Sequence, residues 1–252
     1  MAVITAIDDA DARGLVEVYG LGGLRAVEGI AGGSVNSNFA LVTTEQGRVF
    51  LRLYEEQDDA GAARETAMLE RLAAAGVPTP PPLRRLDGAT VSRCRGKPAA
   101  LFPWRDGTMR CQAGVTPRDT AEVGAALGRL HVVGAGGTPV AGRFGVEALR
   151  LRLDRIEAAG HPDLSPRVPS LRAALEDTHR ARDPSLPGGL IHGDLFRDNV
   201  LWGAGGDLSA LLDFESACEG TYAYDLMVTV LSWCFGDDLD GRLAAAMREG
   251  YE

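Results

Sequence analysis

Three oxygen-bearing side chains lie close together in the sequence between residues 190 and 215. Asp194 is followed five residues later by Asn199, and a second aspartate, Asp213, precedes an aromatic residue. The apolar runs after Asn199 and before Asp213 are separated by a glycine-rich turn, a pattern typical of a β-hairpin. A hairpin would bring the three side chains together at one edge. Carboxylate and amide oxygens at such an edge suit a hard divalent cation and a proton acceptor.

The composition excludes several classes of protein. A chain of 252 residues can bury a substantial core in one large or two small domains. Its formal net charge of −9, with scattered basic residues, argues against binding to nucleic acid. No apolar run approaches the ~20 residues that cross a bilayer, and no secretory signal is visible. We therefore expect a soluble cytoplasmic protein that binds no membrane, with its four cysteines reduced.

The first hundred residues are expected to form a sheet with two helices. A glycine- and serine-rich turn at residues 32–38, which contains Ser34 and Asn36, lies between two apolar runs. Such a turn can place backbone N–H groups over phosphates, although most turns of this composition are only turns. The expected helices cover residues 8–19 and 58–75, and the expected strands cover residues 24–31, 38–44, 48–54, 83–86 and 98–104.

A cation and an anion in this region are expected to pair. Arg52 lies between two aromatic residues on one face of its strand, where a solvated arginine is the commoner case. Glu65 falls on the apolar stripe of the helix at residues 58–75, so its carboxylate faces inward. Because an unpaired buried charge is costly, we expect Glu65 to bind Arg52.

The chain after Trp104 is expected to be mainly helical, so we place a domain boundary there, between residues 1–104 and 105–252. His131 lies late in the first of these helices, where a core or capping role is commoner than a catalytic one. The apolar segment at residues 222–235 is expected to be buried throughout. The expected helices cover residues 116–133, 146–158, 169–181 and 239–250.

The order of these parts resembles that of protein-kinase-like phosphotransferases. A glycine-rich turn, a strand with a cation, a helix with an inward glutamate and a helical half precede H-x-D-x-x-x-x-N and D-F. The chain is most similar to the aminoglycoside-phosphotransferase-like kinases, which include choline kinases and a bacterial homoserine kinase. The resemblance implies an α+β fold of two lobes, with an antiparallel sheet in the N-terminal lobe and a helical C-terminal lobe. It also implies ATP and Mg²⁺ as cofactors and a small-molecule hydroxyl as acceptor.

The resemblance assigns a role to each matching position. By position, Asp194 is similar to the family's catalytic base, and His192 to a residue that supports its loop. Asn199 and Asp213 correspond to the Mg²⁺ ligands. The remaining correspondences are the phosphate-positioning pair Arg52 and Glu65, the glycine-rich turn with Ser34 and Asn36, the hinge beside adenine from Phe102 to Trp104, and the structural carboxylate Asp225.

Within the family, several stretches of both halves are similar to homoserine kinase, so L-homoserine is the first expected acceptor. An aminoglycoside, choline or another amino-alcohol is the alternative within the family. A pseudokinase that binds nucleotide without turnover is the alternative from another class, although its usual mark is a lost base or metal ligand. Two departures stand out: Glu215 and Ser216 replace aromatic residues, and the family continues past the position of Glu252, as expected if the chain is a fragment.

Overall fold

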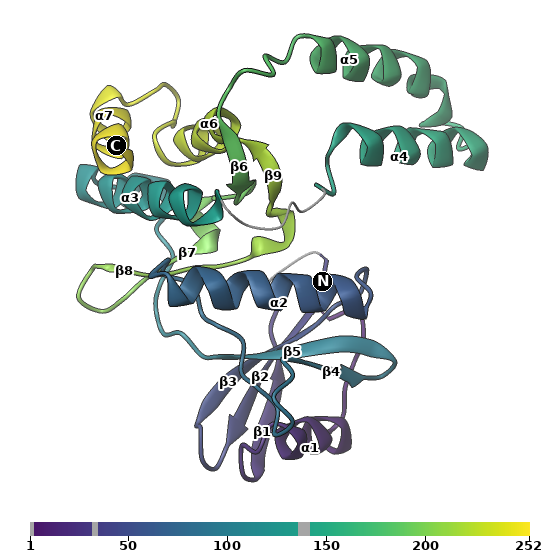
Figure 1. Cartoon of the computed structure of the whole chain (residues 1–252), viewed down its shortest axis with the longest axis vertical. Coiled ribbons are helices and arrows are strands. Elements are labelled where there is room, and N and C mark those ends of the chain that lie inside the picture. The colour runs from purple at the N-terminus through teal and green to yellow at the C-terminus, as the bar shows by residue number, and fades with distance from the viewer. Residues whose placement is uncertain (1–2, 32–34, 136–141) are drawn as a thin grey trace. The chain divides into compact units, whose positions relative to one another are not determined.

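The computed structural model describes residues 3–31, 35–135 and 142–252 (Figure 1). The chain divides into two compact units. The first unit contains Met1–Cys111 and Asp198–Leu212, and the second contains Gln112–Arg197 and Asp213–Glu252. This division differs from the expected boundary after Trp104, because a hairpin from the second half of the sequence belongs to the first unit.

The first unit is built on a five-stranded antiparallel sheet. Its strand order is β1-β2-β3-β5-β4, with each neighbouring pair antiparallel. The strands and helices expected before residue 76 are confirmed. The elements are α1 (Asp9–Val18), β1 (Leu24–Gly29), β2 (Ser37–Thr43), β3 (Arg48–Leu53), α2 (Asp59–Ala74), β4 (Val91–Cys94) and β5 (Lys97–Pro103).

One strand expectation is wrong. Residues 83–86 form no strand; Leu83 follows three prolines and donates a single backbone hydrogen bond, to Leu101. The strand beside β5 is instead β4, joined to it through Arg95 and Gly96, which both have positive φ angles of 50° and 77°. A two-residue turn with this backbone matches the twist of a hairpin. The glycine at 96 was the available signal for it.

The two faces of the sheet differ in chemistry. One face packs against α1 through a core that includes Phe39, Leu41, Leu51 and Leu101. The cross-strand partners of Arg52 are Asn38 on β2 and Ala100 on β5, so these three side chains lie on the other face of the sheet. The first unit therefore keeps an apolar core on one side and presents a buried cation on the other.

The segment Asp198–Leu212 adds a second, two-stranded sheet to the first unit. It contains β7 (Val200–Trp202) and β8 (Leu208–Leu211), which pair antiparallel, as the sequence predicts. Thr108 and Trp202 exchange two backbone hydrogen bonds of 2.9 Å, and Leu211 donates one to Pro78 at 2.6 Å. These long-range bonds explain why the hairpin belongs to the same unit as Pro78 and Thr108, which lie far earlier in the sequence.

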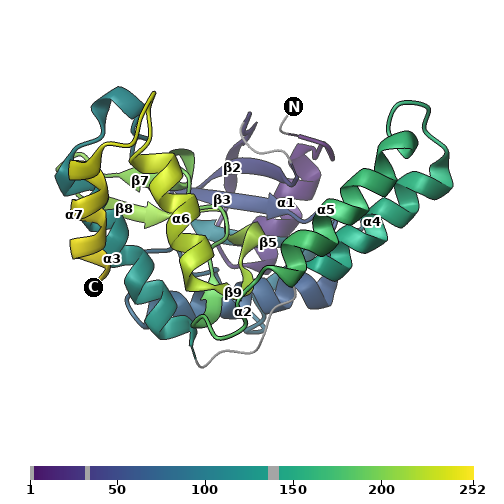
Figure 2. The same ribbon diagram turned by 90° about the horizontal axis from the view of Figure 1, so that it is seen from above.

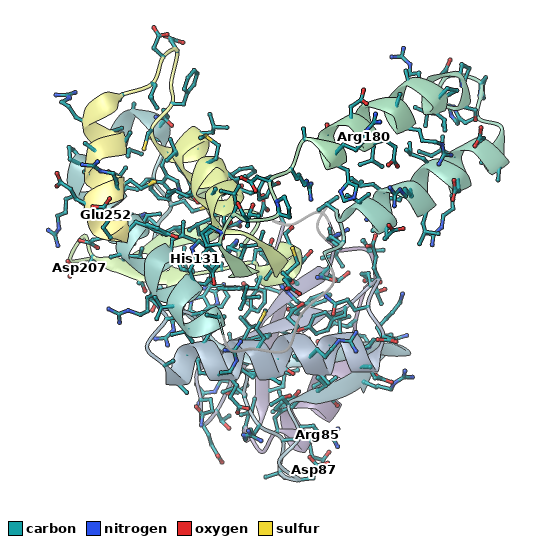
Figure 3. The ribbon with its side chains drawn as sticks, turned by 45° about the horizontal axis from the view of Figure 1, so that its top comes forward. Arg85, Asp87, His131, Arg180, Asp207 and Glu252 are labelled. Atoms are coloured by element: carbon teal, nitrogen blue, oxygen red, sulfur yellow. The ribbon has the colours of Figure 1, made fainter. Side chains whose placement is uncertain are left out.

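The second unit is mainly helical. The helices expected from sequence are confirmed within two residues at either end, and two short strands, β6 and β9, pair antiparallel. Helices α4 and α5 lie side by side (Figures 1 and 2), and Arg180 in Figure 3 marks the end of α5. The elements are α3 (Pro117–Gly134), α4 (Val146–Ala159), α5 (Val168–Arg180), β6 (Gly188–Ile191), β9 (Cys218–Thr221), α6 (Tyr222–Trp233) and α7 (Gly241–Tyr251).

The apolar segment at residues 222–235 is not buried throughout, which corrects the expectation. It forms α6, where Met227 and Leu231 are more than half exposed while Asp225 and Trp233 are fully buried. The Asp225 and Trp233 side chains hydrogen-bond to the backbone of residues 192–195, so polar contacts contribute to selecting the inward face of this helix. No helix among the described residues is long and apolar enough to span a membrane.

Helices α3 and α7 approach each other so closely that their contact requires glycine. A Cβ on Gly124 would lie 2.1 Å from the carbonyl oxygen of Met247. Gly124→Ala is therefore expected to lower the free energy of unfolding by about 1–3 kcal/mol, measured by urea denaturation. The matched control is Gly14→Ala in α1, where nothing lies within 4 Å. That change should stabilise by about 0.4–1 kcal/mol. Equal effects of the two substitutions would contradict the close packing.

Candidate active site

The buried cation of the first unit is held by a buried carboxylate. Arg52 on β3 is 8% exposed and Glu65 on α2 is 7% exposed. The Arg52 Nη1 and Glu65 Oε1 atoms are 3.4 Å apart, so the expected ion pair is present. Two further donors hold the carboxylate: the Tyr54 hydroxyl at 3.1 Å and the Gln57 amide at 2.9 Å. The pair is therefore fixed in place, and its role in positioning phosphates stays a prediction.

The other residues expected to contact nucleotide lie on the same sheet or beside it. Ser34 lies outside the described residues. Asn36 is buried, and its side-chain oxygen accepts a hydrogen bond from the backbone N–H of Glu55. Phe102 is buried on β5 near Phe50. Trp104 donates to Asp106 and is covered by the guanidinium of Arg48, 3.8 Å from its ring centre.

In the second unit, the residues 192–196 form what we call the Asp194 loop. The backbone N–H of Phe196 donates to the carbonyl of Asp194 at 2.8 Å, which closes a tight turn. Leu195 is fully buried, and its carbonyl accepts a hydrogen bond from the indole of Trp233 at 3.0 Å. The half-buried side chain of Asp194 is therefore carried by a loop that α6 anchors from within.

A single carboxylate holds the start of this loop. The Asp225 carboxylate on α6 accepts hydrogen bonds from the backbone N–H groups of His192 and Gly193, at 2.7 and 2.8 Å. His131 Nε2 lies 3.0 Å from the same carboxylate, and His131 Nδ1 lies 2.8 Å from the Tyr251 hydroxyl. An ionised carboxylate only accepts, so Nε2 carries the proton and donates it. His131, labelled in Figure 3, therefore supports the loop and is not free for proton transfer.

The pKa of Asp225 follows from these contacts. Burial by itself raises the pKa of this carboxyl. The hydrogen bond from His131, the charge of His192 and the two backbone donors outweigh burial and hold the pKa below its ordinary value of 3.8. Asp225 is thus a charged, fully satisfied group at neutral pH.

The segment that follows Asp213 packs against the Asp194 loop. Asp213 itself has left-handed backbone angles, φ 59° and ψ 66°, which aspartate tolerates better than most residues. The rings of Phe214 and His192 lie 4.6 Å apart. A Cβ on Gly193 would lie 2.8 Å from the carbonyl oxygen of Ser216, and the φ angle of Gly193 is 78°. Only glycine satisfies both conditions, so the two segments meet backbone against backbone.

The proposed metal ligands divide between the two units, with Asn199 in the first and Asp213 in the second. The hairpin that separates them closes on itself, because Leu212 donates a backbone hydrogen bond to Asn199 at 2.8 Å. Among the described residues, no group of three or more His, Cys, Asp or Glu side chains is arranged to hold a metal ion. The amide oxygen of Asn199 and the carboxylate of Asp213 are donors that fit Mg²⁺, which proteins commonly bind through one or two oxygen side chains together with substrate phosphates.

Sequence reasoning missed several supporting residues. Gln57 lies between β3 and α2 and carries no signal that would pair it with Glu65. Tyr54 shares a strand face with Arg52, so its contact could have been anticipated. Arg143, which forms an ion pair with Glu215, lies in a loop with no recognisable motif.

The family model described as the phosphotransferase enzyme family matches residues 26–252. The chain belongs to this family. It is a kinase that transfers a phosphoryl group to a hydroxyl group, and ATP is the donor that such enzymes use.

Curated relatives carry a more specific name. A protein of Rhodospirillum rubrum named homoserine kinase is 40% identical over 243 residues, which cover 93% of this chain and 73% of the relative. A homoserine kinase of Methylobacterium radiotolerans is 38% identical over 266 residues, covering 100% of this chain and 78% of the relative. A third, from Methylocella silvestris, is 37% identical over 245 residues, covering 93% and 73%.

Solved structures show that the fold is that of small-molecule kinases. An amicoumacin kinase in complex with AMP-PNP, Ca²⁺ and Ami has a TM-score of 0.75 and 16% identity, over 96% of this chain and 79% of that chain. A spectinomycin phosphotransferase in complex with ADP and spectinomycin has a TM-score of 0.69 and 15% identity, over 98% and 80%. The expected α+β kinase fold is therefore confirmed.

Proposed function

We propose that this kinase transfers the γ-phosphoryl group of ATP to the side-chain hydroxyl of L-homoserine. The products are ADP and O-phospho-L-homoserine, a step of threonine biosynthesis. One observation carries the proposal: three curated relatives named homoserine kinase are 37%, 38% and 40% identical to this chain in alignments that cover at least 93% of its length. The proposal places the reaction in the cytoplasm, where ATP is available.

Asp194, Arg52 and Glu65 have different roles in this reaction. A bond forms between the homoserine oxygen and the γ-phosphorus while the bond from that phosphorus to the ADP oxygen breaks. The Asp194 carboxylate orients the hydroxyl and accepts its proton. The Arg52 guanidinium, oriented by Glu65, contacts the phosphates of ATP.

Asn199 and Asp213 are the residues that would hold Mg²⁺. The ion would supply positive charge that neutralises the charge on the phosphates during transfer. The proposal for Mg²⁺ is supported by the oxygen donors of these two side chains. The Ca²⁺ present with AMP-PNP in the solved amicoumacin kinase shows that a divalent cation accompanies nucleotide in that protein.

The alternative acceptors receive less support. The spectinomycin phosphotransferase and the amicoumacin kinase are 15% and 16% identical to this chain, so their likeness concerns the fold alone. A pseudokinase is opposed by the presence of all three motif residues, Asp194, Asn199 and Asp213.

The test is a coupled assay of ADP formation with purified protein, ATP, MgCl₂ and one acceptor at a time. Homoserine, choline, spectinomycin and kanamycin form the panel, and mass spectrometry identifies the phosphorylated product. We expect homoserine to give the highest kcat/KM and O-phosphohomoserine to be the product. Faster turnover of choline or an aminoglycoside would reject homoserine as the acceptor, and nucleotide binding without turnover of any acceptor would support the pseudokinase.

A further inference from the structure

Tyr251, on the last turn of α7, contacts the imidazole of His131 on α3. The Tyr251 hydroxyl lies 2.8 Å from His131 Nδ1. On the other side of the ring, Nε2 lies 3.0 Å from the carboxylate of Asp225 on α6. His131 is 3% exposed and Asp225 is fully buried. The ring is therefore held between a hydroxyl and a carboxylate that come from two other helices of the second unit.

Backbone contacts set the position of Tyr251 relative to this ring. Helices α3 and α7 lie side by side (Figures 1 and 2). A Cβ on Gly128, one turn before His131, would lie 2.7 Å from the carbonyl oxygen of Tyr251. A Cβ on Gly250 would overlap the carbonyl oxygen of Ala121. Because the two backbones meet on both sides, α7 cannot slide along α3 without a clash, and the Tyr251 hydroxyl stays at Nδ1.

The directions of the two hydrogen bonds follow from the chemistry of the partners. An ionised carboxylate only accepts, so Nε2 carries a proton. In a neutral imidazole the other nitrogen is an acceptor, so Nδ1 accepts from the Tyr251 hydroxyl. Burial, followed by the nearby Tyr222 and Asp225, raises the pKa of Tyr251, so its hydroxyl keeps the proton that it donates. The opposite tautomer would direct the lone pair of Nε2 at the carboxylate.

The same carboxylate holds the backbone before the proposed base. Asp225 Oδ2 accepts from both His131 Nε2 and the backbone N–H of His192, and Oδ1 accepts from the backbone N–H of Gly193. Gly193 precedes Asp194. A buried carboxylate that loses one of three donors is left with an uncompensated charge, so the tautomer of His131 bears directly on the group that anchors the Asp194 loop.

We propose that Tyr251 is a positioning residue for phosphoryl transfer: its hydroxyl fixes the Nε2–H tautomer of His131, which keeps Asp225 bonded to the Asp194 loop. The inference rests on the proposed function, because that function makes Asp194 the base. Tyr251 itself touches no reacting atom and acts through the other two side chains.

Tyr251→Phe tests the proposal, since it removes the hydroxyl and keeps the ring. The rate constant kcat, measured at saturating homoserine and ATP, is expected to fall by about 10-fold, because a small displacement of a reacting group slows the chemical step. The KM for ATP should stay at the wild-type value, since the Arg52 and Glu65 side chains belong to the first unit.

Tyr222→Phe is the matched control. The Tyr222 ring stacks on the ring of His131, with the ring centres 4.3 Å apart. Its hydroxyl donates to the backbone carbonyl of His131 at 3.3 Å and not to the imidazole. This substitution therefore removes the same atom from a second tyrosine at the same histidine. The tautomer of His131 and kcat should both remain those of the wild type, and thermal melting of the two variants shows that each is folded.

Nitrogen-15 NMR of the histidine rings reads the tautomer directly and needs no substrate. Spectra are recorded at about pH 8, above the range in which histidine commonly titrates. The wild type and Tyr222→Phe are expected to show a protonated Nε2 and an unprotonated Nδ1 at His131. In Tyr251→Phe, the proton is expected to be distributed over both ring nitrogens, because Nδ1 has lost its donor. A hydroxyl with a merely structural role would leave this signal unchanged.

The inference is overturned if wild-type His131 carries its proton on Nδ1 or on both nitrogens. It is also overturned if Tyr251→Phe keeps the wild-type tautomer, whatever happens to kcat, or if it changes the tautomer without lowering kcat. Failure of the proposed function is a separate result, because the wild type would then not phosphorylate homoserine while the NMR signal of His131 would still report its tautomer.

Discussion

Replacing Asp194 with alanine is expected to lower kcat by about 10²- to 10⁴-fold, because the acceptor hydroxyl loses the group that orients it and takes its proton. Binding of ATP should be largely retained, since the proposed phosphate contacts come from Arg52 and the metal ligands. Steady-state kinetics give the first quantity, and calorimetric titration with a non-hydrolysable ATP analogue gives the second.

Asp198→Ala is the matched control for this substitution. Asp198 lies four residues further along the chain and is exposed, and no role in the reaction is proposed for it. Its replacement should leave kcat within a few-fold of the wild type. Turnover by Asp194→Ala at the wild-type rate would show that Asp194 is not the base, and equal losses in both variants would point to damage of the chain segment and not to lost proton transfer.

Much of the fold could be predicted because its signals are local. The helix α3 begins as its sequence indicates: Thr116 accepts a hydrogen bond from Asp119, which in turn accepts one from the Thr116 backbone. The ion pair of Arg52 and Glu65 was predictable for a different reason. Helical periodicity directs the glutamate inward, and a buried carboxylate requires a partner.

The parts that sequence reasoning missed depend on contacts between distant residues. Hydropathy predicts that all of α6 is buried, yet Met227 is exposed and Asp225 is buried. Asp225 is buried because its carboxylate accepts hydrogen bonds from two backbone N–H groups of the loop at residues 192–196. The position of Arg143 beside Glu215 depends on how the residues around them pack, and neither residue type predicts it. The hairpin β7–β8 is locally visible, but its membership of the first unit depends on Thr108 and Pro78.

These misses share a physical cause that bears on the active site. A loop that carries a reactive side chain has few hydrogen bonds of its own, so other elements must supply them. In this chain, Asp225 and Trp233 on α6 supply an acceptor and a donor to the Asp194 loop. They lie eight residues apart, so they share a face of the helix. The position of Asp194 is therefore determined as much by α6 as by its own motif.

Replacing Asp225 with alanine is expected to lower the free energy of unfolding by on the order of 3–5 kcal/mol, because the buried N–H groups of His192 and Gly193 and the ring N–H of His131 lose their acceptor. Urea denaturation measures this loss. Activity should fall as well, since the Asp194 loop loses its anchor, and kcat should be affected more than the KM for ATP. Asp154→Ala is the matched control: Asp154 forms an exposed ion pair with Arg172, so its loss should cost under about 1 kcal/mol.

The effect of Asp225 should also depend on pH, with a sign that follows from its lowered pKa. A carboxyl whose pKa is lower in the folded state than its ordinary value of 3.8 stabilises the fold fully above that value. This stabilisation is lost as the pH falls through the folded-state pKa. The difference in unfolding free energy between the wild type and Asp225→Ala should therefore be constant near neutral pH and shrink below about pH 4. A difference that stayed constant on acidification would show that Asp225 acts through its shape and not through its charge.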